Sequence, residues 1–273
     1  MNEKKHLSKK ILLFCLGCAL VGQTAFWVQN RMAVQTIAEN YPLQQQPPYT
    51  IALDAGHGGL DTGASYGRLE EVLICENTVD ELFSLLEQNS NFKPIRTREN
   101  GQGCPISKRA EKVIAEKASL LLSIHMNLDV SNTQSHGFEC FPLPPGRKWS
   151  QQSLQFAQYI AEEMGKEGHR LRGSNGVRFA YYSGKRKLIV DAEDTKERTL
   201  KSFGILEQVS CPAVLAEQCF LSNANDRKTW ADEQGCKKAA EVYYRAICRY
   251  FAVDEAPPSA NCNPYPVEPF STQ

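Results

Sequence analysis

The chain has 273 residues and a formal net charge of zero, because 31 basic residues balance 31 acidic ones. Without a basic excess, the composition gives no support to nucleic-acid binding, and we set that class of protein aside. Hydrophobic residues make up 42% of the chain, which is ordinary for a globular core, and the length suits one large domain or two small ones.

The N-terminus has the pattern of an export signal. Several lysines within the first ten residues precede an apolar stretch from Ile11 to Val21. A basic flank before an apolar core predicts a signal peptide or a short signal anchor over residues 1–28. An apolar span of about 18 residues is at the lower limit for crossing a bilayer, so cleavage and an uncleaved membrane anchor both stay open. We therefore expect an exported protein that is periplasmic, associated with the cell envelope or secreted.

Eight cysteines follow the signal, and none of them forms a CxxC pair, which argues against a zinc ribbon. Several lie in apolar stretches, where a free cysteine behaves as a small hydrophobic residue. An oxidising compartment also allows one or two disulfides, for which the sequence indicates no partners.

The rest of the chain alternates strand and helix signals. A polar linker at 29–48 leads to a folded part at 49–252, and a proline-rich tail at 253–273 is expected to be disordered. The predicted strands are 49–54, 92–97, 119–125, 137–142 and 211–217, and the predicted helices are 71–88, a short one after Pro105, 149–166 and 230–251. This alternation predicts a single α/β domain with a mostly parallel mixed sheet and helices on both faces.

Three of these strands end in a residue suited to metal binding or acid–base chemistry. The first leads into His57 within a glycine-rich loop, the third ends in His125, and the last ends in Glu217. Taken singly, His57 is equally well a turn residue and His125 a buried core histidine. An unpaired buried carboxylate is costly, however, so Glu217 is hard to explain by packing. Ligands of parallel sheets gather at the carboxyl ends of strands, which favours one shared site.

Two histidines and one carboxylate make a common catalytic zinc set. Glu70 or Glu71, at the start of the first predicted helix, can turn back toward the end of the first strand, and both stay open on this reasoning. Glu217 would then be free to take a proton from the activated water and pass it to a leaving amine. The residues therefore predict a zinc hydrolase that acts on an amide.

In their order, these segments resemble the Amidase_3 family, the zinc-dependent N-acetylmuramoyl-L-alanine amidases that cleave bacterial cell walls. The segments that carry the resemblance are Asp54–Gly59, Asp61, Gly63–Ala64, Glu71, Thr97–Arg98, Arg109, Ser123–Asn127 and Pro212–Asn223. They extend over nearly all of the foldable chain. The resemblance implies hydrolysis of the amide between N-acetylmuramic acid and L-alanine, with peptidoglycan as the partner and Zn²⁺ as the cofactor.

The resemblance also implies roles for individual residues. The metal ligands of the family map onto His57, Glu71 and His125, and its catalytic glutamate maps onto Glu217. Glu71 is preferred to Glu70 because of its spacing from the neighbouring motifs, and Glu76 would need a shortened helix. The residues themselves indicate structural roles for the remaining candidates, with Arg98 and Arg109 pairing with acids in the core and His136 and His169 solvated or capping. A role of the two arginines near the substrate stays open.

The chain departs from the family pattern at three places. Gln218-Cys219 stand where the family has a small hydroxyl residue and glycine, and Met126 replaces a small residue, which would narrow the pocket. The region 179–200 is longer and more charged than the usual connection. It is interpreted as a solvated excursion, with a lid over the metal or a grip on the glycan as the competing hypothesis.

Two other functions are compatible with these residues. One is an exported zinc peptidase acting on wall peptides. The other is a non-catalytic wall-binding module of the same fold, for which we would expect a lost ligand or a lost glutamate, and neither is lost. The sequence identifies no activating protein partner.

Overall fold

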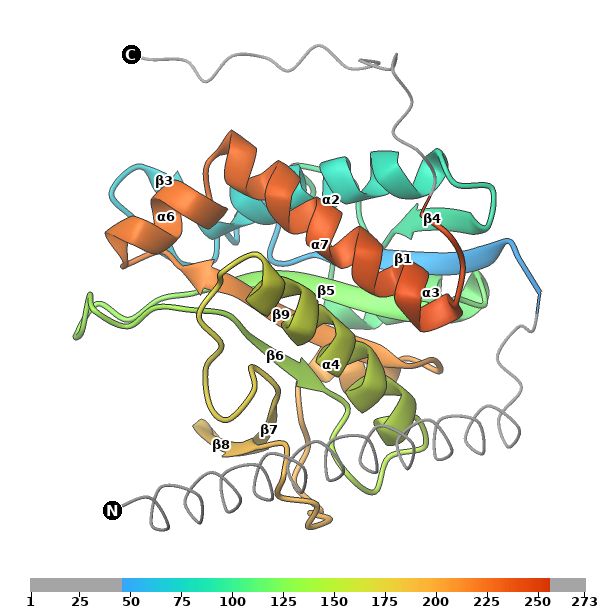
Figure 1. Ribbon diagram of the computed structural model, residues 1–273. Coiled ribbons are helices and arrows are strands. Elements are labelled where there is room, and N and C mark those ends of the chain that lie inside the picture. The colour runs from blue at the N-terminus through green and yellow to red at the C-terminus, as the bar shows by residue number, and fades with distance from the viewer. Residues whose placement is uncertain (1–45, 256–273) are drawn as a thin grey trace, which may run out of the picture. The chain divides into compact units, whose positions relative to one another are not determined.

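The computed structural model describes residues 46–255, and its centre is a five-stranded sheet in the order β4-β1-β5-β9-β6 (Figure 1). The strands are β1 (Tyr49–Ala55), β4 (Phe92–Arg96), β5 (Leu120–Asn127), β6 (Glu139–Pro142) and β9 (Ala213–Phe220). Neighbouring strands are parallel except β6, which runs antiparallel to β9. The mostly parallel mixed sheet predicted from the sequence is therefore confirmed.

Helices cover both faces of this sheet, as predicted. The helices on one face, in front of the sheet in Figure 1, are α2 (Glu71–Glu87), α4 (Ser150–Lys166) and α7 (Glu233–Phe251). Those on the other face are α3 (Ile106–Ala115) and α5 (Gly204–Gln208). Each face thus has its own buried apolar core.

The period of two along a strand determines which side chains share a face. In β5, Leu122 packs under α2 and α7, whereas Leu121 packs in the core under α3. His125 continues the face of Leu121, and in β9 Glu217 continues the face of Leu215, which belongs to the same core. Strand geometry alone therefore puts His125 and Glu217 on one side of the sheet.

The last predicted helix begins at Glu233 and not at Trp230, which is the last residue of a separate short helix. Helix α6 (Ala224–Trp230) ends before α7 begins, and Asp232 caps α7 by accepting a hydrogen bond of 2.7 Å from the N–H of Gly235. An aspartate at this position satisfies a backbone donor that a continuous helix would have bonded internally. The prediction of one helix over 230–251 is therefore wrong at its first turn.

Four short strands were not predicted. Strands β2 (Ser65–Tyr66) and β3 (Leu69–Glu70) form a small hairpin that leads directly into α2. Strands β7 (Arg178–Ser183) and β8 (Arg186–Asp191) form a second antiparallel hairpin. The N-terminal half of the charged region 179–200 therefore forms a regular β-hairpin.

The seven cysteines of the described part are all free, and six of them are buried. The disulfides that the sequence left possible are therefore absent between these seven. Burial raises the pKa of the Cys75, Cys140 and Cys219 thiols well above the usual range. These thiols act as small apolar groups. Cys262 lies outside the described residues.

The predictions for the signal at 1–28, for most of the linker at 29–48 and for nearly all of the tail at 253–273 also concern residues outside the described range. Within residues 46–255, no helix combines the length and the apolar character needed to cross a membrane.

Candidate active site

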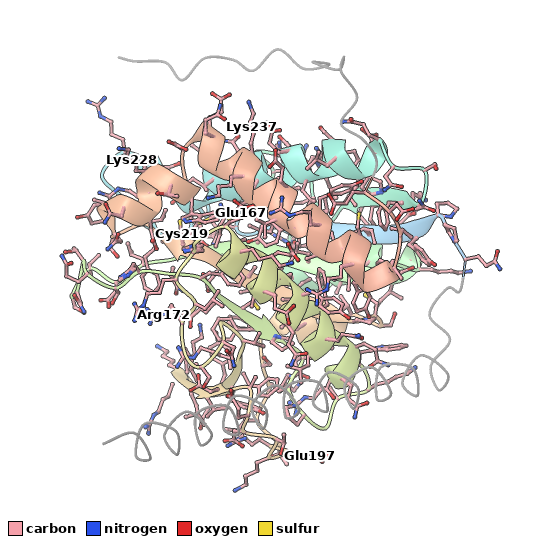
Figure 2. The ribbon with its side chains drawn as sticks, viewed as in Figure 1. Glu167, Arg172, Glu197, Cys219, Lys228 and Lys237 are labelled. Atoms are coloured by element: carbon pink, nitrogen blue, oxygen red, sulfur yellow. The ribbon has the colours of Figure 1, made fainter. Side chains whose placement is uncertain are left out.

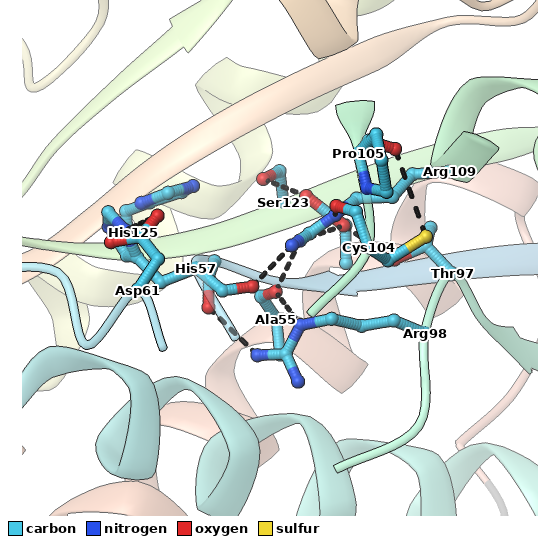
Figure 3. A network of polar contacts seen from close by, with 12 residues as sticks. Ala55, His57, Asp61, Thr97, Arg98, Cys104, Pro105, Arg109, Ser123 and His125 are labelled. Carbon is cyan, nitrogen blue, oxygen red and sulfur yellow. Dashed lines mark hydrogen bonds and ion pairs between the residues drawn. The ribbon is translucent and has the colours of Figure 1, made fainter. Parts of the chain in front are cut away.

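The carboxyl ends of the central strands bring the predicted residues together. His57 follows β1, His125 is near the end of β5, and Glu71 is the first residue of α2. One ligand atom from each of these three side chains lies within 4.8 Å of the other two. The two imidazole rings lie beside each other, with centroids 4.9 Å apart (Figure 3).

The Glu71 carboxylate lies between the two histidines. Its Oε2 is 3.1 Å from Nε2 of His57, and its Oε1 is 3.0 Å from Nδ1 of His125. The backbone N–H groups of Ala64 and Met126 each donate a hydrogen bond of 2.8 Å to one of the same oxygens. Burial raises the pKa of Glu71, but the hydrogen bonds with His125 and His57 outweigh it and hold the pKa well below its usual range.

A second carboxylate, that of Asp61, fixes the orientation of the His57 ring. Nδ1 of His57 is 3.0 Å from Oδ2 of Asp61, whose other oxygen accepts the N–H of Gly63 at 3.1 Å. A carboxylate on the far ring nitrogen is the usual companion of a metal-binding histidine. The hydrogen bond with Glu71 raises the pKa of His57 to about 9, against burial and with help from Asp61. The carboxylates of Glu71 and Asp61 therefore favour a cation at this position.

Glycines leave the space that these side chains occupy. A Cβ on Gly56 would collide with the His125 ring. A Cβ on Gly63 would lie 2.5 Å from Cδ2 of His57 and 2.6 Å from Oε2 of Glu71, and Gly63 also has a φ of +68°. The backbone of His57 itself is left-handed, with a φ of +61°. The loop after β1 is thus shaped around the ligand atoms.

The structure separates the three glutamates that the sequence left as candidates. Glu71 reaches both histidines, whereas Glu70 ends β3 and pairs in register with Ser65. Glu76 forms a buried ion pair with Arg98.

Glu217 lies next to this group without joining it. It pairs with His125 in the β5–β9 register, is buried, and its Oε2 has no hydrogen-bond partner among the residues that the structure describes. Burial raises the pKa of Glu217 to about 7, an effect that His125 opposes and that Glu71 reinforces. A carboxyl group that is half ionised near neutral pH can both accept and donate a proton.

Two buried arginines hold the backbone on which His57 stands (Figure 3). Arg98 donates to the carbonyl oxygens of Ala55 and Gly56 at 3.0 and 2.9 Å. Arg109 donates to those of Ala55, at 2.8 Å, and His57, and also pairs with Asp54 at 3.0 Å. The expectation that both arginines pair with acids in the core is confirmed. Their hydrogen bonds to the backbone carbonyl groups of the loop after β1 were not predicted.

His169 corrects a prediction made from the sequence. It is buried, its ring stacks on Trp230 with centroids 4.2 Å apart, and its Nε2 is 2.8 Å from the carbonyl oxygen of Gln218. His169 is therefore a packed core residue and not a solvated one. His136 is partly exposed and bonds the carbonyl oxygen of Gln134, in keeping with a solvated or capping role.

The side chains that differ from the family pattern near the site point away from it. Met126 and Cys219 belong to the core under α2 and α7, where their sulfur atoms are 3.8 Å apart. Cys219 is labelled in Figure 2. Met126 therefore does not narrow the pocket. Cys219 is not among the residues with positive φ, so replacing the family's glycine costs no backbone strain. The Gln218 amide donates to the carbonyl oxygen of Trp230.

The donor set fits a zinc ion. Zn²⁺ favours imidazole nitrogen and carboxylate oxygen, and three protein ligands leave a position for water or substrate in catalytic sites. The three side chains supply these atoms, and Asp61 and two backbone N–H groups orient them. Among residues 46–255, no other group of histidine, cysteine, aspartate and glutamate side chains meets in this way.

The sequence matches the model of one protein family over residues 51–249, described as N-acetylmuramoyl-L-alanine amidase. This chain belongs to that family. The resemblance noted in the sequence predicted amidase activity with peptidoglycan as the substrate. Both predictions are confirmed at the level of the family.

Individual relatives are distant. The chain is 26% identical to the uncharacterized protein YqiI of Bacillus subtilis over 208 residues, which cover 74% of this chain and 84% of that protein. It is 25% identical to the N-acetylmuramoyl-L-alanine amidase AmiC of Escherichia coli over 224 residues, which cover 75% of this chain. The alignment with this chain covers only 53% of the length of AmiC, and 35% of the length of an uncharacterized cell wall amidase of Bacillus anthracis.

Solved structures of amidases have the same fold. The CwlD amidase of Clostridioides difficile, determined in complex with the GerS lipoprotein, superposes with a TM-score of 0.57 at 27% identity, covering 76% of this chain and 100% of that one. The catalytic domain of CwlV from Bacillus (Paenibacillus) polymyxa gives 0.60 at 24% identity, covering 76% and 99%. The second likeness concerns the fold alone.

Proposed function

We propose that this amidase is zinc-dependent and hydrolyses the amide between N-acetylmuramic acid and L-alanine in peptidoglycan. In this proposal His57, Glu71 and His125 bind Zn²⁺, and Glu217 is the general base and general acid. The observation that carries it is the convergence of three ligand atoms within 4.8 Å beside a buried carboxyl group that has an unpartnered oxygen.

When bound at these ligands, Zn²⁺ would polarise the scissile carbonyl and make water more acidic. Glu217 takes the proton of the attacking water, because its pKa of about 7 leaves it partly ionised at neutral pH. The same carboxyl group then donates that proton to the departing amine of L-alanine. Its burial matters for both steps, since a carboxylate in bulk water would be too weak a base.

The residues around the ligands keep them in place during these steps. Asp61 fixes the ring of His57, so that Nε2 faces Glu71. Arg109 holds the His57 carbonyl, and the N–H of Met126 holds one oxygen of Glu71. Preorganisation of this kind reduces the reorganisation needed at the moment of reaction.

Digestion of purified peptidoglycan, with and without a chelator, tests the proposal. Mass analysis should show free peptides that begin with L-alanine, their release should stop when the metal is removed, and added Zn²⁺ should restore it. Shortened peptides that stay attached to the glycan would instead indicate a zinc peptidase. Wall binding without turnover or bound metal would indicate a non-catalytic module.

The location of the protein is part of the same proposal. A peptidoglycan amidase needs access to the wall, and the basic and apolar pattern of residues 1–28 supports export to the cell envelope. Whether this segment is cleaved can be read from the N-terminal mass of the protein recovered from its host.

A further inference from the structure

The β7–β8 hairpin is firmly attached beside the candidate active site. At its base, Arg178 of β7 pairs with Glu139 of β6 at 2.8 Å and with Asp191 of β8 at 3.3 Å. Glu139 in turn pairs in register with Glu217, so the hairpin starts next to the proposed general base. Two ion pairs through one arginine hold the hairpin base against the sheet.

The segment that returns from the hairpin is held as well. Arg147 donates to the carbonyl oxygens of Arg198 and Leu200 at 2.8 and 2.6 Å and pairs with Glu207 of α5 at 2.9 Å. The N–H of Tyr182 donates to the carbonyl oxygen of Lys201 at 2.8 Å. With both ends anchored, the hairpin is better suited to be a fixed wall of the site than a lid that closes over it.

Charge is unevenly distributed along this segment. Asp191 pairs with Arg178 and Asp194 with Arg198, whereas the exposed Glu193 and Glu197 follow β8 along the chain and lie outside the hairpin turn. The cations of the turn and of early β8, residues 185–187, are exposed, and none of them forms an ion pair within residues 46–255. In a chain with no net charge, this group of cations indicates an anionic ligand.

Lys187 is the one of these cations whose ammonium packs on aromatic rings of the fold. Its Nζ lies 4.7 Å from the ring centroid of Phe203 and 4.9 Å from that of Phe141, so two aromatic faces hold the ammonium in place. Phe141 lies in β6 two residues after Glu139, the register partner of Glu217, and it packs in the core on the face to which Glu217 projects. Lys187 and its cross-strand partner Tyr182 are therefore placed on the same side of the sheet as the proposed general acid, and the charge of Lys187 accordingly lowers the pKa of Glu217.

The position of Glu217 determines which part of the substrate meets this pair. Glu217 must donate its proton to the amine that leaves, and that amine belongs to L-alanine at the start of the stem peptide. Side chains that border Glu217 therefore lie on the peptide side of the scissile bond and not on the glycan side. Any stem peptide carries at least its C-terminal carboxylate, so an anionic group is available on that side.

We propose that Lys187, bordered by Tyr182, is a specificity-determining residue that binds a carboxylate of the stem peptide, while Lys185 and Arg186 extend the same cationic subsite along the peptide. This inference rests on the proposed function and names the part of the substrate that the hairpin recognises.

Kinetics with two soluble substrates test the inference. One is an N-acetylmuramoyl peptide with free carboxylates, and the other is the same molecule with its carboxylates converted to amides. Lys187→Met keeps the apolar stem on the two rings and removes the charge. It should raise KM about tenfold for the acidic substrate, the effect of one partly exposed charged contact, and leave KM for the amidated substrate unchanged. Lys187→Arg should retain the preference for the acidic substrate.

Lys117→Met is the matched control. Lys117 is exposed and precedes β5, so it lies near the N-terminal end of that strand, whereas His125 lies near the C-terminal end. It should leave both KM values unchanged. Equal KM changes for the two substrates in Lys187→Met would overturn the inference. So would unchanged KM values together with weaker binding to whole walls, which would assign the hairpin to another anionic wall polymer.

A binding measurement separates this inference from the proposed function. Calorimetry of the acidic stem peptide with the zinc-loaded wild-type protein and with Lys187→Met needs no turnover. Weaker binding in the variant, with binding that decreases as salt increases, supports the subsite even if neither substrate is cleaved. Equal binding in both proteins overturns the subsite even if the amidase activity is established.

Discussion

Glu217 lies directly beside His125, because the register of β9 on β5 pairs the two residues. Both project from the same face of the sheet, and the imidazole lowers the pKa of a carboxyl group that burial raises. The proposed proton donor and acceptor is thus fixed one strand away from a candidate metal ligand. The spacing between the two is that of neighbouring strands, about 4.8 Å, and needs no loop to maintain it.

Glu217→Gln should lower kcat at least about a hundredfold while the protein still binds one zinc ion, because the amide cannot accept the proton of water. Turnover of a soluble muramoyl peptide and metal content by mass spectrometry measure the two effects. Glu116→Gln is the control, since Glu116 is a partly exposed carboxylate paired with Lys93. Near-normal turnover in Glu217→Gln would assign the proton transfer to another group.

Glu217 should also make the stability of the metal-free protein depend on pH. Its pKa rises from 4.5 to about 7 on folding, so between these values the unfolded chain has lost a proton that the folded protein keeps. Stability is therefore fully present below pH 4.5 and falls as pH rises to 7. The advantage of Glu217→Gln over wild type should grow by on the order of 3 kcal/mol between pH 4 and pH 8.

Urea unfolding in the presence of a chelator measures this difference. Titrating groups far from Glu217 are the same in both proteins, so their contributions cancel in the comparison. A constant difference across the pH range would mean that Glu217 is not desolvated in the folded protein.

Gly63→Ala should abolish tight zinc binding, because the new methyl group would press against His57 and Glu71. Gly67→Ala is a close control: Gly67 also has positive φ, at +64°, but no other atom lies within 4 Å of the position of its Cβ. Both variants pay the strain of a left-handed backbone, about 1 kcal/mol. Only Gly63→Ala should lose zinc affinity in a competition titration with a metal indicator; equal affinities would contradict the ligand arrangement.

Arg109→Gln should cost about 3–5 kcal/mol of stability, because it leaves Asp54 buried without its ion pair. It also releases the carbonyl oxygen of His57, so zinc affinity should fall about tenfold or more. Arg186→Gln removes an exposed charge of the hairpin and should change neither quantity. Unfolding and zinc titration of both variants check this, and unchanged zinc affinity in Arg109→Gln would show that the loop keeps its shape without the arginine.

The strand ends could be predicted from the sequence, because buried strands are short apolar runs and a polar residue after them is conspicuous. His125 and Glu217 then share a face through the period of two alone. Glu71 could not be separated from Glu70 by such reasoning. Its approach to the histidines depends on a loop with left-handed backbone at His57 and Gly63, which no periodicity specifies.

The hairpin was missed although its signals are present. Gly184-Lys185 is a two-residue turn between stretches that contain strand-forming residues, and Gly184 has a φ of +58°. The high charge of the following residues suggested a solvated connection instead. His169 was missed for the opposite reason, because its burial depends on stacking with Trp230, a residue far away in the sequence.

The strand order has a consequence for the timing of activity during synthesis. Strand β9 is the last to leave the ribosome, yet it is inserted between β5 and β6 in the interior of the sheet. A nascent chain that has emerged as far as β8 already contains His57, Glu71 and His125 but lacks Glu217 and the strand that supports it. Prematurely terminated products therefore lack Glu217, so that under the proposed mechanism lytic capacity would arise only once nearly the whole catalytic fold has been made.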